Sequence, residues 1–266
     1  DIPERFNIAT AACDRYADGS GRLALIYCDE DGATTKLSFD DIAAASCRFA
    51  NVLTDAGLVR GDRVAVWLKN GPEFPATLFG IWRAGGVVTV INNFLKPAEV
   101  AFILRDAGAR IVITDASLAE AQPHVAALLT DLKFLRVENY SALAEADAPA
   151  PAELNESDLA ALLYTSGTTG HPKGAMLTHG NFLANVRSCF VCLDFHEEDR
   201  VLVLDAPKPG HIVLTWQGKE VFSYEDGHFI SADRRVQLYD SLFKEKSIVH
   251  TVIERMCESL INELPV

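Results

Sequence analysis

The sequence predicts an α/β fold with a mostly parallel sheet flanked by helices over residues 1–205, followed by a C-terminal α+β region at 206–266. Two observations support the α/β prediction. Short apolar runs typical of buried strands alternate with stretches whose apolar residues recur at helical spacing, and this alternation indicates βαβ units. Glycine, proline and capping residues separate the runs, which marks where helices begin and end. Right-handed crossovers would then place helices on both faces of the sheet.

The elements follow one another from residue 38 onward. Ser38 and Asp41 form a capping-box pattern, Pro97 occupies a first helical position, and Gly57 and Gly108 follow helical stretches as C-terminal caps do. Helices are predicted over residues 38–56, 72–84, 97–107, 118–129 and 181–195. Strands are predicted over residues 63–68, 87–91, 111–114, 134–137, 159–163, 175–177 and 200–204.

The pattern changes after Asp205, where two prolines interrupt the chain. Residues 211–216 and 221–224 predict a hairpin across Gln217-Gly218, and 228–230 a third short strand. Two helices should follow, and the second has an apolar stripe between Val249 and Leu264. Such a stripe is more often core packing or a helix partner surface than a cofactor site, so we expect it to be buried within the chain or in a homodimer.

The stretch from Tyr164 to Gly174 carries the functional signal. It reads Tyr-Thr-Ser-Gly-Thr-Thr-Gly-His-Pro-Lys-Gly and follows a buried-strand pattern. Its glycines allow the backbone to turn sharply and approach a ligand, its hydroxyls add donors, and its lysine adds a mobile positive charge. The stretch therefore predicts a polyphosphate site. Its candidate ligand-binding residues are Thr165, Ser166, Gly167, Thr168, Thr169, Gly170 and Lys173.

Two other interpretations of this loop are less favourable. A Walker A loop has glycine before its lysine and serine or threonine after it, whereas here Pro172 precedes Lys173 and Gly174 follows. The predicted order is also strand, loop, strand and only then a helix, with Thr178 as its N-cap. An exposed Ser/Thr/Gly turn is the plain alternative. It does not account for lysine, glycines and hydroxyls meeting in one short loop after a strand.

On these residues the loop resembles the phosphate-binding motif of the adenylate-forming superfamily, which includes acyl- and aryl-CoA synthetases, luciferases and peptide-synthetase adenylation domains. The resemblance extends over about residues 3–205 and includes scaffold stretches such as 61–66, 83–87 and 103–109. It implies that a carboxylic acid and ATP give an acyl-adenylate and pyrophosphate, and that CoA then takes the acyl group. It also implies Mg²⁺, and it assigns the β- and γ-phosphates of ATP to the loop from Thr165 to Lys173.

The sequence departs from the family pattern beyond this point. It contains no aromatic-Gly-x-Thr-Glu stretch and no Thr-Gly-Asp, and no hinge or small C-terminal domain with its catalytic lysine is recognised. Residues 226–233 only faintly resemble the ribose-binding stretch, which would make Asp233 its carboxylate. Catalytic residues therefore stay unassigned. We expect an acid–CoA ligase present as a truncated or rearranged chain. The alternatives are an acyl-AMP ligase serving a carrier protein, or a non-catalytic module that keeps only the phosphate loop.

Composition limits the partners. The formal net charge of −13 argues against nucleic acid and anionic membrane surfaces. No stretch has the length of a membrane span and no signal pattern opens the sequence, so we expect a cytoplasmic protein. Cys189 and Cys192 form a C-x-x-C with His196 nearby, but no second pair completes a zinc site. Two cysteines on one helix face explain this spacing better than a metal.

Overall fold

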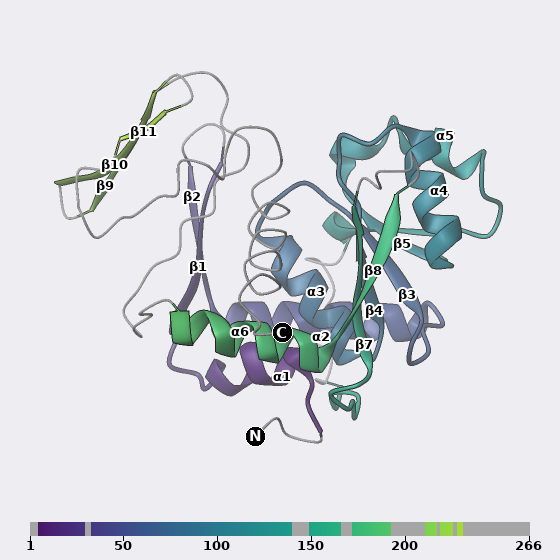
Figure 1. The fold of residues 1–266 in the computed structure, drawn as a ribbon, viewed down its shortest axis with the longest axis horizontal. Helices are drawn as coiled ribbons and strands as arrows, with labels where there is room; N and C mark the ends of the chain where they lie inside the picture. Colours follow the sequence, from purple (N-terminus) through teal and green to yellow (C-terminus); the bar gives the residue numbers. More distant parts are fainter. Residues whose placement is uncertain are drawn as a thin grey trace, which may run out of the picture. The chain divides into compact units, whose positions relative to one another are not determined.

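A computed structural model of the chain describes residues 5–29, 33–139, 149–165, 172–192, 211–216, 219–225 and 228–230. It divides into two units, Asp1–Asp194 and Phe195–Val266, each of which is described by itself. Figure 1 shows the elements of both units. The first unit contains the candidate phosphate site.

A six-stranded sheet organises the first unit, in the order β6-β5-β3-β4-β7-β8. Five neighbouring strands run parallel, and β8 joins the edge antiparallel to β7. The predicted mostly parallel sheet flanked by helices is therefore confirmed. The strands are β3 Arg63–Trp67, β4 Val87–Val90, β5 Ile111–Thr114, β6 Lys133–Arg136, β7 Leu159–Thr165 and β8 Lys173–Thr178.

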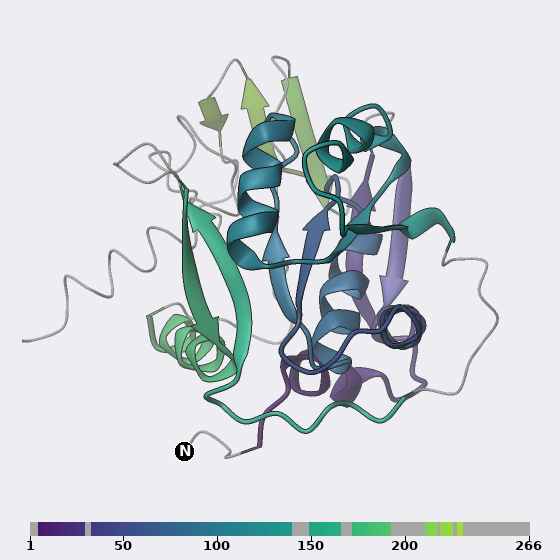
Figure 2. The same cartoon turned by 90° about the vertical axis from the view of Figure 1, so that its right-hand side faces the viewer.

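Helices cover both faces of this sheet, as Figure 2 shows for α4. Alternate side chains of β3 point to opposite faces. Val64 and Val66 belong to one core cluster with α1 Ile8–Ala12, α2 Phe39–Asp55 and α3 Glu73–Arg83, whereas Ala65 and Trp67 belong to another with α4 Pro97–Ala107 and α5 Gln122–Ala126. The sheet is therefore buried on both sides, which explains why its strands read as continuous apolar runs.

The predicted helix signals act as expected in α2 and α4. The Ser38 hydroxyl accepts a hydrogen bond from the N–H of Asp41 at 3.1 Å, and the Asp41 carboxylate accepts from the N–H of Ser38 at 2.8 Å. Pro97 is the first residue of α4, and Gly108 ends it with a φ of 66°. Gly57, which follows α2, has a φ of 91°. Positive φ at both positions explains the need for glycine.

The predicted helix over residues 118–129 is present only in part, because the structure has a shorter helix within this range. The chain forms a 3₁₀ turn, η2 Ala116–Leu118, and then the five-residue helix α5. The Asp115 carboxylate accepts from the Ser117 N–H at 2.8 Å and tightens the first turn. Pro123 lies at the start of α5, where a missing N–H is tolerated, but it could not lie inside one continuous helix.

The predicted strand before the phosphate loop and the strand and helix after it are confirmed, although their limits differ. The strand β8 begins at Lys173, two residues before the predicted strand, and the helix α6 spans His179–Cys192. The Thr178 hydroxyl accepts from the Asn181 N–H at 3.1 Å, and the Asn181 side chain accepts from the Thr178 N–H at 3.0 Å. Thr178 is thus the predicted cap. The last predicted helical residues, 193–195, lie outside the described part.

The N-terminal elements were not predicted. They are α1, the 3₁₀ turn η1 Asp14–Tyr16 and the antiparallel hairpin of β1 Leu23–Cys28 with β2 Thr34–Ser38. A further 3₁₀ turn, η3 Val137–Asn139, follows β6. The first three residues of β2 are exposed, so this strand lacks the apolar alternation by which half-buried strands are recognised.

The second unit contains β9 His211–Trp216, β10 Lys219–Glu225 and β11 His228–Ile230 in an antiparallel sheet of order β11-β10-β9. The predicted hairpin and third strand are present. The strand at 200–204, Asp233 and the apolar stripe from Val249 to Leu264 lie outside the described residues, and a domain boundary near residue 205 stays a prediction.

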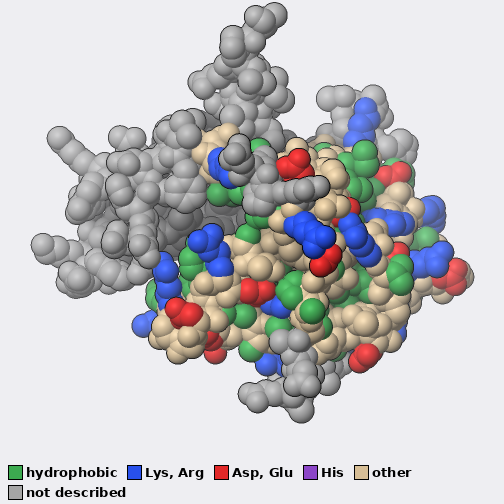
Figure 3. Space-filling model, turned by 90° about the horizontal axis from the view of Figure 1, so that it is seen from below, with side chains coloured by type: hydrophobic (Ala, Val, Ile, Leu, Met, Phe, Trp, Pro, Cys, Tyr) green, Lys and Arg blue, Asp and Glu red, His purple; other side chains and the backbone are tan. Residues whose placement is uncertain are grey.

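Surface features of the described residues add two facts. Figure 3 shows Lys and Arg side chains interspersed with Asp and Glu on the face seen from below, so this face presents no broad region of one charge. Among the described residues, no helix combines the length and the apolar character that crossing a membrane requires.

Candidate functional site

The candidate site begins at the carboxyl edge of the parallel strands. Because β3, β4, β5 and β7 run in the same direction, their last residues meet at one edge of the sheet. Open α/β sheets bind ligands beyond this edge. Thr165 is the last residue of β7, so the predicted phosphate loop leaves the sheet at the position where this fold places ligands.

The two described ends of the loop lie opposite each other. Thr165 pairs with Lys173 across the antiparallel strands β7 and β8, and Tyr164 pairs with Gly174. Thr165 is half-buried and Lys173 is exposed. Directly opposite residues in such a ladder have Cα atoms roughly 5 Å apart, so one hydroxyl and one ammonium group flank the mouth of the loop. Ser166, Gly167, Thr168, Thr169 and Gly170 lie outside the described residues.

Tyr164 anchors this end of β7 to the helix α4. Its hydroxyl donates a hydrogen bond of 2.6 Å to Oδ2 of Asp106, and its side chain is 9% exposed. Burial, followed by the hydrogen bond and the negative charge of Asp106, raises the pKa of Tyr164 well above its usual value. The tyrosine is therefore a permanent donor. Sequence reasoning missed Asp106, although an acid in the otherwise apolar stretch 103–107 is a signal.

Hydrogen bonds to the Asp115 carboxylate also connect the ends of β3 and β5. Oδ2 of Asp115 accepts from the N–H of Lys69 at 3.0 Å, and Oδ1 accepts from Ser117. Asp115 follows β5 directly and Lys69 lies just beyond β3, so the carboxylate holds together two loops of the ligand-binding edge. This residue was not predicted, because the sequence does not show which loops meet.

The turn after β4 lies at the same edge of the sheet as Thr165. Val90 pairs with Leu163 in the parallel ladder, so the chain that follows β4 and the end of β7 leave the sheet at this edge. Oδ1 of Asn92 accepts from the Phe94 N–H at 2.9 Å, which holds the turn, and Phe94 is 83% exposed. The turn therefore presents a fixed polar and aromatic surface beside the site. Two asparagines directly after a buried strand were the available signal.

His179 lies at the opposite end of β8 from Lys173, at the start of α6. Its side chain is fully buried, and Nδ1 accepts a hydrogen bond of 3.4 Å from the N–H of Ile8. Burial lowers the pKa of His179 to about 4, opposed by the charge of Asp158. A neutral, buried imidazole at this end supports packing and is not available to a phosphate.

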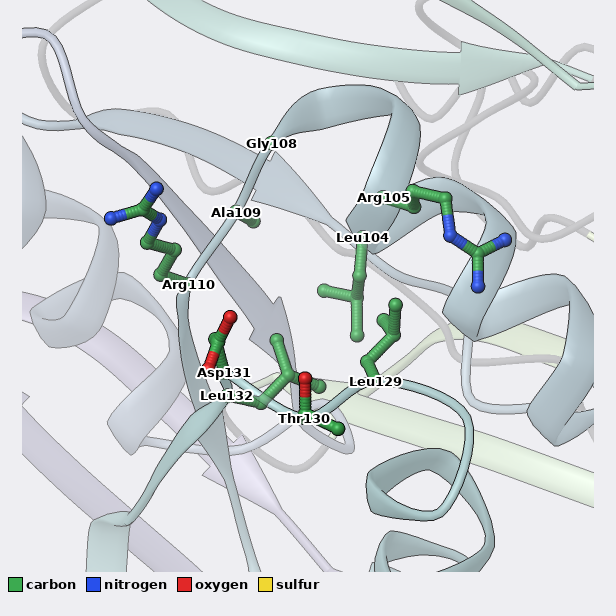
Figure 4. A pocket seen from close by; sticks show the side chains of 9 residues that line it. All are labelled: Leu104, Arg105, Gly108, Ala109, Arg110, Leu129, Thr130, Asp131 and Leu132. Atoms are coloured by element: carbon green, nitrogen blue, oxygen red, sulfur yellow. The ribbon is translucent and has the colours of Figure 1, made fainter.

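A small pocket at the other edge of the sheet is a less suitable ligand site. It has a volume of about 170 Å³ and lies where α4 ends and β5 and β6 begin. Leucines line much of it, and Figure 4 shows the guanidinium groups of Arg105 and Arg110 extending away from each other. The two arginines do not converge on an anion, so the pocket lacks the polar geometry of the carboxyl edge.

The residues considered for a metal do not form a site in the described part. Cys189 lies on α6, and its thiol donates to Oδ1 of Asn185 at 3.7 Å. The side chain of Cys192 and all of His196 lie outside the described residues. Within that described part, no group of three or more His, Cys, Asp or Glu residues could hold a metal ion.

Comparisons with known proteins agree on the class of enzyme. A feruloyl-CoA synthase from Amycolatopsis sp is 38% identical over 169 residues, covering 64% of this chain and 34% of that protein. A 4-coumarate–CoA ligase from Pinus taeda is 34% identical over 215 residues, covering 76% and 39%. The crystal structure of ATP-bound MatB from Rhodopseudomonas palustris is 31% identical with a TM-score of 0.58, covering 70% and 37%.

The matched regions cover 34% and 39% of these two relatives, so the chain spans about a third of the length of the curated relatives it matches. The residues matched by the family, 13–213, include all six strands of the sheet, the helices α2 to α6 and both described ends of the phosphate loop. The sequence profile of the AMP-binding enzyme family matches residues 13–213, which is well over half of the chain. Together with the hairpin that brings Thr165 opposite Lys173 at the ligand-binding edge, this match shows that the chain belongs to the AMP-binding enzyme family.

Proposed function

We propose that this chain supplies the ATP phosphate-binding part of an acid–CoA ligase. In that reaction a carboxylate attacks the α-phosphate of ATP, pyrophosphate leaves, and the thiol of CoA then displaces AMP from the acyl-adenylate. The proposal rests on the β7–β8 hairpin, which presents Thr165 and Lys173 on either side of one loop at the carboxyl edge of the sheet. The named activities of two CoA-ligase relatives support the proposal.

The proposed roles follow from the charge problem of the reaction. An anionic carboxylate must approach an anionic phosphate, so donors that are already in place must neutralise the developing charge. Lys173 would screen the β- and γ-phosphates. The hydroxyls of Thr165, Ser166, Thr168 and Thr169 would donate to phosphate oxygens, while Gly167 and Gly170 would let backbone N–H groups approach. The net charge of −13 makes these local donors necessary.

Magnesium would add charge neutralisation when bound with ATP. It prefers oxygen ligands, and the described edge offers the hydroxyl of Thr165. The Asp115 carboxylate is already engaged by the backbone of Lys69 and Ser117. No metal ligand is therefore assigned among the described residues.

We propose only the class of the substrate, a carboxylic acid, and no single compound, because the named relatives act on different acids. A non-catalytic phosphate-binding module is the second candidate, because the described residues place Thr165 and Lys173 at the ligand-binding edge but no catalytic group is assigned among them. Transfer to a carrier protein instead of CoA, a cytoplasmic location and a homodimer through the stripe from Val249 to Leu264 stay predictions.

Calorimetry tests the proposal on the 266-residue chain, with ATP and pyrophosphate titrated separately in the presence of Mg²⁺. We expect weak binding by the unmodified chain. Lys173→Ala should weaken it at least about tenfold, because a charge-assisted contact to phosphate is lost. Lys36→Ala provides the control, since Lys36 is an exposed lysine of β2 remote from the loop. Equal affinities for the two lysine variants would contradict the assignment of Lys173.

A further inference from the structure

Tyr164 contacts the strand segments on both sides of the phosphate loop. It directly precedes Thr165 in β7, and it pairs with Gly174, which directly follows Lys173 in β8. A Cβ atom added to Gly174 would lie 2.9 Å from Cζ and 3.2 Å from the hydroxyl oxygen of Tyr164. Real Cβ contacts are essentially never closer than 3.0 Å, so the Tyr164 ring occupies the space that a side chain at position 174 would need.

The orientation of this ring is set from outside the hairpin. Asp106 belongs to α4, 58 residues earlier in the chain, and Oδ2 of Asp106 accepts the 2.6 Å hydrogen bond from the Tyr164 hydroxyl. The ring itself packs into the core cluster that contains Leu104 and Ala107 of the same helix. A hydrogen bond to an ionised acceptor is shorter and more directional than a neutral one, so it selects one ring position.

We propose that Asp106 is a positioning residue that acts through Tyr164 to hold Thr165 and Lys173 in the geometry that binds phosphate. Asp106 would itself contact no ligand. It fixes the ring, the ring fixes the backbone of Thr165 and Gly174, and those two residues set where the Thr165 hydroxyl and the Lys173 ammonium group lie. The inference rests on the proposed function for its ligand, but its structural part concerns the chain alone.

Four single variants and one double variant of the full 266-residue chain separate positioning from general stability. Tyr164→Phe removes the hydroxyl and keeps the ring, Asp106→Ala removes the acceptor, and Asp106→Asn restores an acceptor oxygen. Asp55→Ala is the control for losing an exposed acid from a helix, since Asp55 ends α2 on the opposite face. Binding of pyrophosphate is measured by calorimetry, and the melting temperature is recorded for every variant.

We expect Tyr164→Phe and Asp106→Ala each to weaken pyrophosphate binding about fivefold, as the loss of one hydrogen bond would. Asp106→Asn should restore most of the affinity, and Asp55→Ala should leave it unchanged. The double variant Tyr164→Phe with Asp106→Ala should bind as weakly as either single variant, because both remove the same interaction. Additive losses, or losses that follow the melting temperature without rescue by asparagine, would overturn the proposal.

Amide hydrogen exchange gives a readout that needs no ligand. In Tyr164→Phe and Asp106→Ala, exchange should become faster for the amides of Thr165 and Lys173 and stay unchanged at the other end of the ladder, at Leu159 and Thr178. If the unmodified chain fails to bind pyrophosphate, the proposed function fails while this exchange pattern still decides the positioning role. Unchanged exchange at Thr165 and Lys173 would refute that role even if binding is normal.

Discussion

The surroundings of the two ring nitrogens of His179 keep its imidazole neutral. Nδ1 accepts the N–H of Ile8, so the proton of the neutral ring sits on Nε2, and Nε2 is buried without a hydrogen-bond partner among the described residues. The indole of Trp82 packs edge-on at 6.4 Å between ring centroids. Charging this ring would place a cation in an apolar environment, which explains why burial lowers its pKa to about 4.

This shift predicts a loss of stability in mild acid. Between pH 6.5, the ordinary value for histidine, and pH 4, the unfolded chain binds a proton at His179 that the folded chain does not. The contribution of His179 to the free energy of unfolding should therefore be fully present above pH 6.5 and fall by up to about 1.4 kcal/mol for each pH unit between pH 6.5 and pH 4. Urea denaturation at pH 7 and pH 5 measures this loss.

Histidine variants supply the control for the pH effect. His179→Gln should show a smaller loss between pH 7 and pH 5 than the unmodified chain, even if it is less stable at both. His124→Gln should keep the full loss, because His124 is exposed in α5. The same pH dependence in all three proteins would show that His179 does not cause it.

At the scale of elements, α2 and α3 approach each other closely through one glycine. A Cβ at Gly80 would lie 2.5 Å from Cβ of Phe49 and 2.9 Å from the carbonyl oxygen of Ser46. Both obstructing atoms are held by the α2 backbone, so neither can move aside as the end of a flexible side chain would. The helix α3 also carries the buried Arg83, whose guanidinium forms an ion pair with Asp14 of η1.

The close approach predicts that Gly80→Ala destabilises the chain despite the higher helix propensity of alanine. Overpacking of this kind typically costs about 1–3 kcal/mol of unfolding free energy. Gly71→Ala is the matched control, because its nearest obstructing atom, at 3.1 Å, is a carboxylate oxygen of the Glu73 side chain and its φ is not positive. Urea denaturation of both variants checks the difference, and equal stabilities would mean that α2 and α3 separate easily.

Elements with local signals were predicted better than those without them. The limits of α2 and α4 follow from caps at Ser38, Pro97 and Gly108, which act within a few residues. The prediction for residues 118–129 has the wrong limits, because Leu118 closes a 3₁₀ turn capped by Asp115 and α5 starts only at Gln122, with Pro123 in its first turn. For the site, the sequence identified the loop and both of its ends. The partners Asp106 and Asp115 could not be predicted, because their contacts join segments that are distant in the chain.

At the scale of the whole molecule, the sheet ends at an edge strand next to the site. No described strand pairs with the outer side of β8, and Met176 on this strand is 68% exposed. The first unit therefore presents the phosphate loop on a hairpin whose inner strand is buried and whose outer strand is open. The described residues provide phosphate donors at this edge, but no assigned metal ligand and no assigned catalytic group.

This incomplete set of groups predicts the activity of the 266-residue chain. We expect it to release pyrophosphate from ATP far more slowly than a CoA ligase with a complete set of catalytic groups, because no metal ligand and no catalytic group is assigned among its described residues. Loss of one preorganised donor typically lowers a rate by a factor of about 100 to 1,000, and several groups are unassigned here. The assay measures pyrophosphate release with a panel of fatty and aromatic acids, with and without CoA, and includes Lys173→Ala. Rapid turnover that Lys173→Ala abolishes would show that this chain contains the remaining catalytic groups, and that residues beyond the described site supply them.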